Sequence, residues 1–142
     1  MKRTLLFSAI LTSLLAFSSC SEDTIPRMIW EFYDYDSSAV SAGYSHDFDY
    51  RINIIAVPDY EGSITLKCKN YGKLDIVENS FTGSPEYPEL GYSVTKIDDK
   101  TIKVSFRPVE SYNKHDSGYV QIDGVKGNIT NWNIISICRA TR

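Results

Sequence analysis

Two pairs of aspartates are the residues of this chain whose types and spacing come nearest to a chemical site. Asp34 and Asp36, and likewise Asp47 and Asp49, stand two residues apart, so in a strand both carboxylates of a pair point the same way. Carboxylates that converge from neighbouring strands could bind calcium or act as acid and base on a glycosidic bond. A solvated outer strand face is the favoured interpretation of both pairs.

The calcium interpretation can be tested against the pattern of the EF-hand loop, the best-known calcium-binding loop. Such a loop starting at Asp34 needs glycine at its sixth position and glutamate at its twelfth, but Ala39 and Ser45 stand there. The two histidines, His46 and His115, have no second histidine or cysteine at metal-ligand spacing. The chain also lacks a Gly-x-Ser-x-Gly motif and a phosphate-binding glycine loop. We therefore expect no metal, no cofactor and no catalysis.

Aromatic residues are the better candidates for a binding site, because the chain has ten tyrosines and two tryptophans. In residues 28–35, Trp30 and Phe32 share one strand face while the tyrosines share the other, so one pair should lie near the surface. Exposed rings suit sugar faces and protein partners, although tyrosine also simply favours strands. The candidate ligand-binding residues, on that second face or in loops, are Tyr33, Tyr35, Tyr44, Tyr87 and Tyr112.

The elements that must position these residues have a hydrophobic period of two. Alternation is clearest in residues 47–54, where Phe48, Tyr50, Ile52 and Ile54 are expected on the buried face. The other expected strands are residues 28–35, 63–69, 73–77, 92–97, 101–107, 119–125 and 129–140. The turn at residues 98–100 predicts a hairpin between two of them. The last strand is apolar on both faces, so we expect it in the centre of a sheet.

About seven to eight short strands without a capped amphipathic helix predict an all-β fold. We expect an antiparallel, immunoglobulin-like β-sandwich that forms one domain over residues 28–142. Residues 79–91, which contain Pro85 and Pro88, form the longest irregular stretch and are a candidate functional loop; an ordinary long connection is the alternative.

The N-terminus has the composition of a cleaved export signal over residues 1–19. Lys2 and Arg3 precede an apolar run that is too short to span a membrane, and small residues precede Cys20. Removing this segment leaves 13 basic and 18 acidic residues, a net charge of −5 that argues against nucleic-acid binding. Residues 15–20, Leu-Ala-Phe-Ser-Ser-Cys, resemble a bacterial lipobox, in which the cysteine becomes the lipidated N-terminus. Phe17 departs from the leucine that this pattern prefers, which leaves an ordinary signal-peptidase site as the alternative.

The residues after Cys20 extend the resemblance to a Bacteroidetes-type surface lipoprotein. Ser21-Glu22-Asp23 is similar to the acidic export tag of such proteins, and Asp23-Thr24-Ile25 is similar to their O-glycosylation motif at Thr24. The resemblance implies an outer-membrane location, a lipid anchor and a domain that faces the cell exterior, with residues 20–27 as anchor and tether. A periplasm-facing anchor is the alternative.

Export also affects the interpretation of Cys68 and Cys138, because the compartments to which proteins are exported permit disulfides. A bridge across their 70-residue separation could stabilise the fold by roughly 4 kcal/mol in the chain-entropy model. Two free thiols packed as small apolar side chains are the alternative. A true immunoglobulin signature needs a tryptophan soon after the first cysteine, and neither Trp30 nor Trp132 stands there.

Together these features predict a non-catalytic lipoprotein module of the cell envelope that binds a glycan or assists a surface glycan-capture system. Modules of the BACON type resemble this chain in size and strand number, but their tryptophan-containing core pattern is absent, so no residue role is carried over. The alternative is an envelope protein that acts through a protein interface, as a structural subunit, an inhibitor or an immunity lipoprotein.

Overall fold

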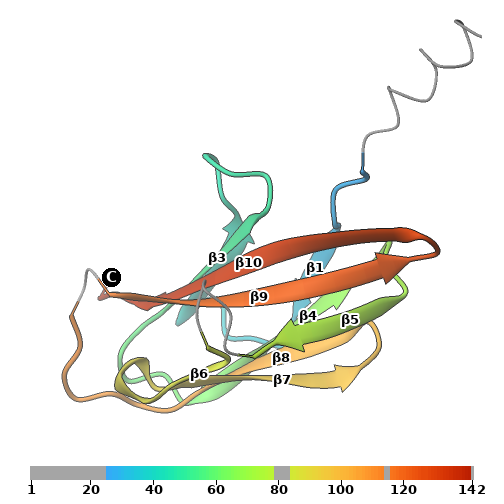
Figure 1. Ribbon diagram of the computed structural model, residues 1–142. Coiled ribbons are helices and arrows are strands. Elements are labelled where there is room, and N and C mark those ends of the chain that lie inside the picture. The colour runs from blue at the N-terminus through green and yellow to red at the C-terminus, as the bar shows by residue number, and fades with distance from the viewer. Residues whose placement is uncertain (1–24, 79–83, 114–115, 142) are drawn as a thin grey trace, which may run out of the picture.

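The computed structural model describes residues 25–78, 84–113 and 116–141, which form ten strands and a single helical turn (Figure 1). The elements are β1 (Trp30–Tyr33), β2 (Val40–Tyr44), β3 (Arg51–Ala56), β4 (Gly62–Cys68), β5 (Lys73–Val77), β6 (Glu86–Tyr87), the 3-10 turn η1 (Pro88–Leu90), β7 (Tyr92–Asp98), β8 (Thr101–Phe106), β9 (Ser117–Lys126) and β10 (Ile129–Arg139).

The strands form two five-stranded sheets that pack face to face (Figure 1). The first sheet has the order β1-β4-β8-β7-β6 and the second the order β2-β3-β10-β9-β5. Strands β1, β4, β8 and β7 take the A-B-E-D order of immunoglobulin domains, while β5, β9 and β10 take the C-F-G order. The expected immunoglobulin-like sandwich is thus confirmed. The expectation that every pair is antiparallel is wrong for one pair, because β3 runs parallel to β10.

The core consists of the inward-facing alternate residues of both sheets. Ile52 and Ile54 of β3 and Ile135 of β10 are fully buried, as the alternation of apolar and polar residues predicts. Trp30 links the sheets, because its buried indole N–H donates a 2.7 Å hydrogen bond to the side-chain oxygen of Asn133 in β10. This bond offsets the cost of burying two polar groups.

The strands expected from the sequence all form, with ends shifted by a few residues, and β10 lies at the centre of its sheet as expected. The hairpin of β7 and β8 is also confirmed, with a bulge between Lys96 and Asp98. Two short strands were not expected: β2, and β6 within the stretch interpreted as a loop. The hairpin of β9 and β10 closes through Gly127 and Asn128, with Gly127 at a positive φ of 58° as in a type II′ turn.

The largest error concerns residues 47–54. Only the second half is a strand, because the backbone N–H of Arg51 donates to the carbonyl of Phe48 in a turn and β3 begins at Arg51. Phe48 and Tyr50 therefore do not continue the buried face of Ile52 and Ile54, and both are exposed.

A second error concerns the alternation in residues 28–35. Trp30 and Phe32 face the core as expected, but Asp34 adopts a left-handed conformation with φ of 55°. This turn ends β1 and reverses the phase, so Tyr35 packs against the core rather than beside Tyr33. The two tyrosines therefore do not form one outer face.

The two cysteines are free thiols, so the disulfide alternative is wrong for this structure. Cys68 is buried at the end of β4, opposite Trp30 of β1, whose indole reaches Asn133. Cys138 is five residues beyond Asn133 in β10, which is about 17 Å along a strand. Cys68 and Cys138 are therefore too far apart for a bridge.

One end of the sandwich is held together by a buried arginine. The guanidinium of Arg139 is fully buried and donates four hydrogen bonds to the carbonyl groups of Val57 (2.8 Å), Leu90 (2.9 Å), Gly91 (3.3 Å) and Arg107 (2.5 Å). These carbonyls come from three separate connections, so one side chain fixes the β3–β4 connection, η1 and the segment after β8. We call this end the far end, because the chain enters the domain at the opposite end.

The described residues contain no helix that is long and apolar enough to cross a membrane; the only helical element among them is the three-residue turn η1.

Candidate functional site

Three exposed aromatic rings lie in contact on the outer face of the second sheet. Phe48 is 41% exposed, Tyr50 38% and Trp132 44%. The ring centres of Phe48 and Tyr50 are 5.5 Å apart, and those of Tyr50 and Trp132 are 4.9 Å apart, with the ring planes tilted by 39° and 53°. We call these three residues the aromatic surface.

The turn between β2 and β3 places two of these rings. Backbone hydrogen bonds from Ser45 N–H to the Arg51 carbonyl (2.9 Å) and from Arg51 N–H to the Phe48 carbonyl (3.1 Å) close the turn. The Tyr50 carbonyl accepts a 2.8 Å bond from the N–H of Ile134 in β10, which ties the turn to the second sheet. Residues 45–47, Ser-His-Asp, precede Phe48, and serine and aspartate favour such a tight turn.

Trp132 is held by the asparagines on either side of it. The side chain of Asn131 accepts a 2.8 Å bond from the Trp132 N–H, and the side chain of Asn133 donates a 2.8 Å bond to the Trp132 carbonyl. The pairing of β3 with β10 begins only at Ile134, so no strand pairs with the backbone of Trp132 on that side. The two amides satisfy these backbone groups and fix the position of the indole.

Arg51 is held against the aromatic surface by contacts with aromatic rings. Its guanidinium carbon is 4.7 Å from the ring centre of Phe48 and 5.6 Å from that of Tyr119 on β9. Its Nε is buried without a hydrogen-bond partner, and no hydrogen bond or ion pair of this side chain occurs within the described part of the chain. Cation–π contacts therefore hold the guanidinium in place, and only its terminal nitrogens can face a ligand, because Nε is buried.

Polar side chains border the rings on the same face. Asp123 of β9 is directly opposite Trp132, and its carboxylate accepts a 2.8 Å hydrogen bond from Gln121. The arrangement thus combines flat apolar rings with a carboxylate, an amide and a guanidinium. Such a surface can stack on the apolar face of a pyranose while the polar groups bond its hydroxyls.

The five tyrosines expected to bind ligand do not come together. Tyr33 is half-buried on the outer face of the first sheet, whereas Tyr35, Tyr44, Tyr87 and Tyr112 are half-buried and pack against the core. They come from both sheets and both ends of the sandwich, so they form no common surface.

Tyr44 and Tyr87 show why their rings face inward. The hydroxyl of Tyr44 accepts a 2.6 Å hydrogen bond from the backbone N–H of Trp30. The guanidinium of Arg27 lies 4.2 Å from the ring centre of Tyr44. Tyr87 pairs with Tyr92 across β6 and β7, and the two rings stack at 6.2 Å. Both tyrosines are therefore used in packing.

The paired carboxylates also lie apart. Asp34 and Asp36 are in the turn before β2, and Asp47 and Asp49 are in the turn after it, so the five residues of β2 separate them by about 17 Å. All four side chains are exposed. Within the described residues no group of three or more His, Cys, Asp or Glu side chains is placed to hold a metal ion.

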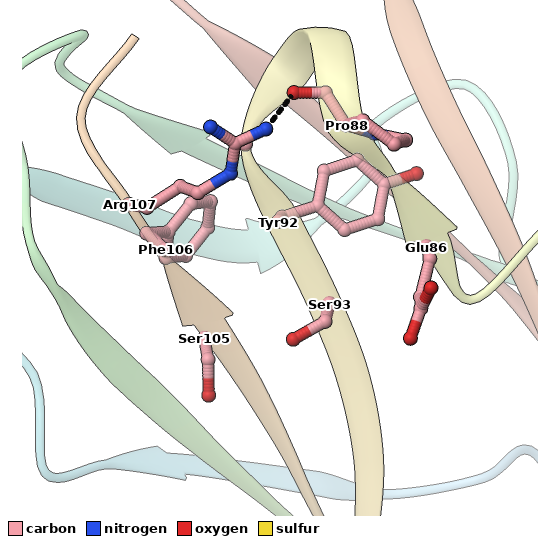
Figure 2. A pocket seen from close by; sticks show the side chains of 8 residues that line it. Glu86, Pro88, Tyr92, Ser93, Ser105, Phe106 and Arg107 are labelled. Carbon is pink, nitrogen blue, oxygen red and sulfur yellow. Dashed lines mark hydrogen bonds between the residues drawn. The ribbon is translucent and has the colours of Figure 1, made fainter.

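A shallow hollow of about 290 Å³ on the outer side of the first sheet is the competing candidate (Figure 2). Figure 2 shows Ser93 and Ser105 side by side on β7 and β8, and Arg107 turned toward the carbonyl of Pro88, to which it donates a 2.5 Å bond. The aromatic residues that line it, Tyr92 and Phe106, are buried and offer no ring face to a ligand.

Tyr92 has the most perturbed acid–base behaviour of these residues, but it belongs to the core. Burial, with a smaller contribution from Tyr87, raises the pKa of Tyr92 to about 12. Its buried hydroxyl has no hydrogen-bond partner and lies against Gly118 of β9, where a Cβ atom would collide with it. The hydroxyl points across the sandwich and away from any surface on which a ligand could bind.

Alternation does not indicate the aromatic surface, because it places Phe48 and Tyr50 on the buried face of a strand and gives the strand of Trp132 two apolar faces. A turn signal was present in Ser45-His46-Asp47, and asparagines flank Trp132 on both sides. Both patterns favour local side-chain to backbone bonds, which form in the turn before β3 and satisfy the backbone of Trp132 where β10 has no partner on that side. Cys20, Thr24 and residues 79–83 of the expected loop lie outside the described residues.

No protein-family model matches the chain, and no curated protein is similar to it in sequence.

Proposed function

We propose that this chain is a lipid-anchored, non-catalytic binding module of the cell envelope, and that it binds glycans through the aromatic surface. The observation that carries the proposal is the contact of three exposed rings, Phe48 and Tyr50 of the β2–β3 turn and Trp132 of β10, with ring centres 5.5 and 4.9 Å apart. Exposed apolar side chains are common singly, but aromatic residues in contact on a rigid face form a binding surface.

The polar neighbours favour a glycan as the ligand. A pyranose presents an apolar C–H face for stacking and a rim of hydroxyls for hydrogen bonds. The rings of Tyr50 and Trp132 can stack on the apolar C–H face. The side chains of Gln121, Asp123 and Arg51 provide acceptors and donors for the hydroxyls. The buried Nε of Arg51 is out of a ligand's reach, so the sugar hydroxyls are assigned to the terminal nitrogens of its guanidinium.

Binding without catalysis is supported by the separation of the paired carboxylates. The two carboxyl groups of a glycosidase flank the bound sugar, whereas the two pairs here lie at opposite ends of β2 and all four side chains are exposed to solvent. We accordingly propose that the protein captures its ligand and leaves the chemistry to other proteins.

The proposed anchor is Cys20, lipidated after removal of residues 1–19, with Thr24 as a glycosylation site in the tether. The lipobox-like residues before Cys20 and the acidic residues after it support an outer-membrane location with the domain facing the exterior. Several acyl chains on one residue, at about 0.8 kcal/mol per buried methylene, would make the anchor effectively permanent.

An envelope protein is the alternative ligand, because tyrosine, tryptophan and arginine are also the residues that dominate protein interfaces. Phe48, Tyr50, Trp132 and Arg51 lie within one contiguous group, as such an interface would require. The test of the main proposal separates the two.

The test is a glycan array probed with the mature protein in detergent, beside a Tyr50→Ala/Trp132→Ala double variant. We expect selective binding that the double variant loses by at least tenfold, since it removes two of the three rings. Tyr33→Ala, on the other sheet, is the matched control and should bind like the unchanged protein. If folded protein binds nothing on a broad array, the glycan proposal fails, and cross-linking through Trp132 to envelope proteins becomes the test of the alternative.

A further inference from the structure

The N-terminal segment enters the domain at a fixed place. The Pro26 carbonyl accepts hydrogen bonds from the Tyr71 hydroxyl (2.5 Å) and the Asn131 amide (3.1 Å). Asn70 bonds both the Arg27 carbonyl (2.7 Å) and the Ile29 N–H (2.8 Å). The segment is thus fixed to the β4–β5 turn and to β10, so the direction in which the chain leaves the domain is set by the fold.

Three turns surround this entry point on the same side of the molecule (Figure 1). They are the β4–β5 turn, the β7–β8 turn and the β9–β10 turn. Backbone bonds join them: Lys69 N–H to the Ile29 carbonyl (2.7 Å), Leu74 N–H to the Asp99 carbonyl (2.7 Å) and Gly72 N–H to the Val125 carbonyl (2.9 Å). We call segment 25–29 and these turns the N-terminal end.

The N-terminal end carries exposed isoleucines beside lysines. Ile25, Ile29, Ile97 and Ile129 are each more than a third exposed, and they come from three different parts of the chain. The exposed lysines at this end are Lys69, Lys73, Lys100 and Lys126. Acidic residues lie there as well. Asp98 and Asp99 are in the β7–β8 turn, Asp49 pairs with Arg27 of the segment at 3.7 Å, and Lys96 pairs with Asp75 at 3.8 Å and with Asp99 at 3.0 Å. The four exposed lysines of this end are in none of these ion pairs.

The far end has the opposite character. Eight exposed carboxylates are described there: Asp34, Asp36, Asp59, Glu61, Glu86, Glu89, Glu110 and Asp116. The molecule therefore has an apolar and basic end where the chain enters and an acidic end away from it. Near an anionic surface, this distribution attracts the first end and repels the second.

Cys20 precedes Ile25 by five residues, which span at most about 17 Å when fully extended. If Cys20 carries acyl chains, as the proposed function holds, the N-terminal end stays within that distance of the bilayer. Exposed aliphatic side chains surrounded by lysines can bind in the head-group region. The aliphatic side chains enter the boundary with the acyl chains, and the lysines contact the anionic head groups.

We propose that the N-terminal end docks on the head-group region of an anionic bilayer and so holds the domain in one orientation. This inference rests on the lipid anchor of the proposed function. Docking would place the far end outward and the aromatic surface on the side of the domain, because Trp132 and Tyr50 lie on the outer face of the second sheet. A glycan could then reach the rings without passing beneath the domain.

The test uses the full mature protein in vesicles of phosphatidylcholine and phosphatidylglycerol that contain brominated lipid, which quenches tryptophan fluorescence at the bilayer. In a Trp132→Phe background, Ile129→Trp reports the N-terminal end. Ile55→Trp is the matched control, because Ile55 is exposed to a similar degree on the outer face of β3 away from that end. Buried Trp30 gives a constant signal that also shows the protein is folded.

We expect the Ile129→Trp emission to be quenched at least twofold more strongly than the Ile55→Trp emission. Equal quenching in protein whose intact mass shows acylated Cys20 would overturn docking and leave the anchor standing. A mass without acyl chains on Cys20 would overturn the anchor and the docking that depends on it.

Discussion

Arg51 and Arg139 lie at opposite ends of the same stretch of paired strands and use the same chemical group in opposite ways. The guanidinium of Arg139 is fully buried, donates four hydrogen bonds to backbone carbonyls and lies 4.8 Å from the ring centre of Phe106. The guanidinium of Arg51 contacts the rings of Phe48 and Tyr119, and its buried Nε donates to nothing.

The difference separates a structural region from a binding region. Unmade hydrogen bonds are costly inside a protein, so a buried arginine that uses four of its five N–H donors on backbone carbonyls contributes to stability and is not open to a ligand. An arginine that is held by rings at the edge of a surface, as Arg51 is, can turn its terminal nitrogens to a partner even though its Nε is buried. The far end around Arg139 is therefore interpreted as the rigid closure of the sandwich, and the surface above Arg51 as the place where a ligand is met.

The largest expected effect is on stability at the far end. Arg139→Met should lower the free energy of unfolding by about 3 to 5 kcal/mol, because four carbonyls from three connections, at two buried and two part-buried hydrogen bonds, lose their donor. Urea denaturation followed by circular dichroism measures the change. Arg107→Met is the control, since Arg107 is exposed and its own carbonyl remains. A loss below about 1 kcal/mol for Arg139→Met would break the comparison.

The second effect is on binding at the aromatic surface. Arg51→Met keeps most of the apolar stem and removes the guanidinium, so unfolding should change by no more than about 1 kcal/mol. Glycan affinity should fall about tenfold, or about 1.4 kcal/mol, measured by calorimetric titration with an oligosaccharide that the array identifies. If stability fell as far as in Arg139→Met while affinity stayed unchanged, Arg51 would be a structural residue like Arg139.

The smallest effect concerns the second buried polar atom without a partner, the Tyr92 hydroxyl. This atom faces the core and can meet no ligand, so it is a cost to folding. Tyr92→Phe should leave stability unchanged or raise it by up to about 1 kcal/mol at pH 7, by urea denaturation. Tyr33→Phe, on an outer face, serves as the control. A clear loss of stability in Tyr92→Phe would show that the hydroxyl has a partner after all.

The pKa of Tyr92 gives the same variant a pH signature. The phenol stays protonated up to a pKa of about 12 in the folded protein, whereas its ordinary value is 10.0. Between these values the unfolded chain loses the proton and the folded protein keeps it, so the free energy of unfolding falls as the pH rises from 10 toward 12. Tyr92→Phe should show a shallower fall, and an identical slope would contradict the assignment.

The fold could be predicted from the sequence because its strands alternate apolar and polar residues. Residues 63–69, 73–77 and 101–107 gave strands within a residue or two of their ends, since one face of each is buried. The parallel pairing of β3 with β10 could not be predicted, because residues 51–56 and 134–139 are far apart in sequence and alternation does not encode strand direction.

The candidate site could be predicted only in kind. Aromatic rings on an outer face were expected, but the chosen tyrosines proved to be half-buried packing residues. Phe48 and Tyr50 continue the phase of Ile52, so the alternation assigned them to the core, and only the turn at Arg51 exposes them. The contact of Tyr50 with Trp132 joins residues 82 positions apart, which no local pattern indicates.

The most direct test of the central claim uses the two tryptophan indole N–H signals in a nitrogen–proton NMR spectrum. Trp30 is buried and bonded to Asn133, whereas Trp132 is exposed on the aromatic surface. On titration with an oligosaccharide from the array, we predict that the Trp132 signal shifts in a saturable way and the Trp30 signal does not. A bound oligosaccharide that leaves the Trp132 signal unmoved would contradict the proposal that this surface binds glycans.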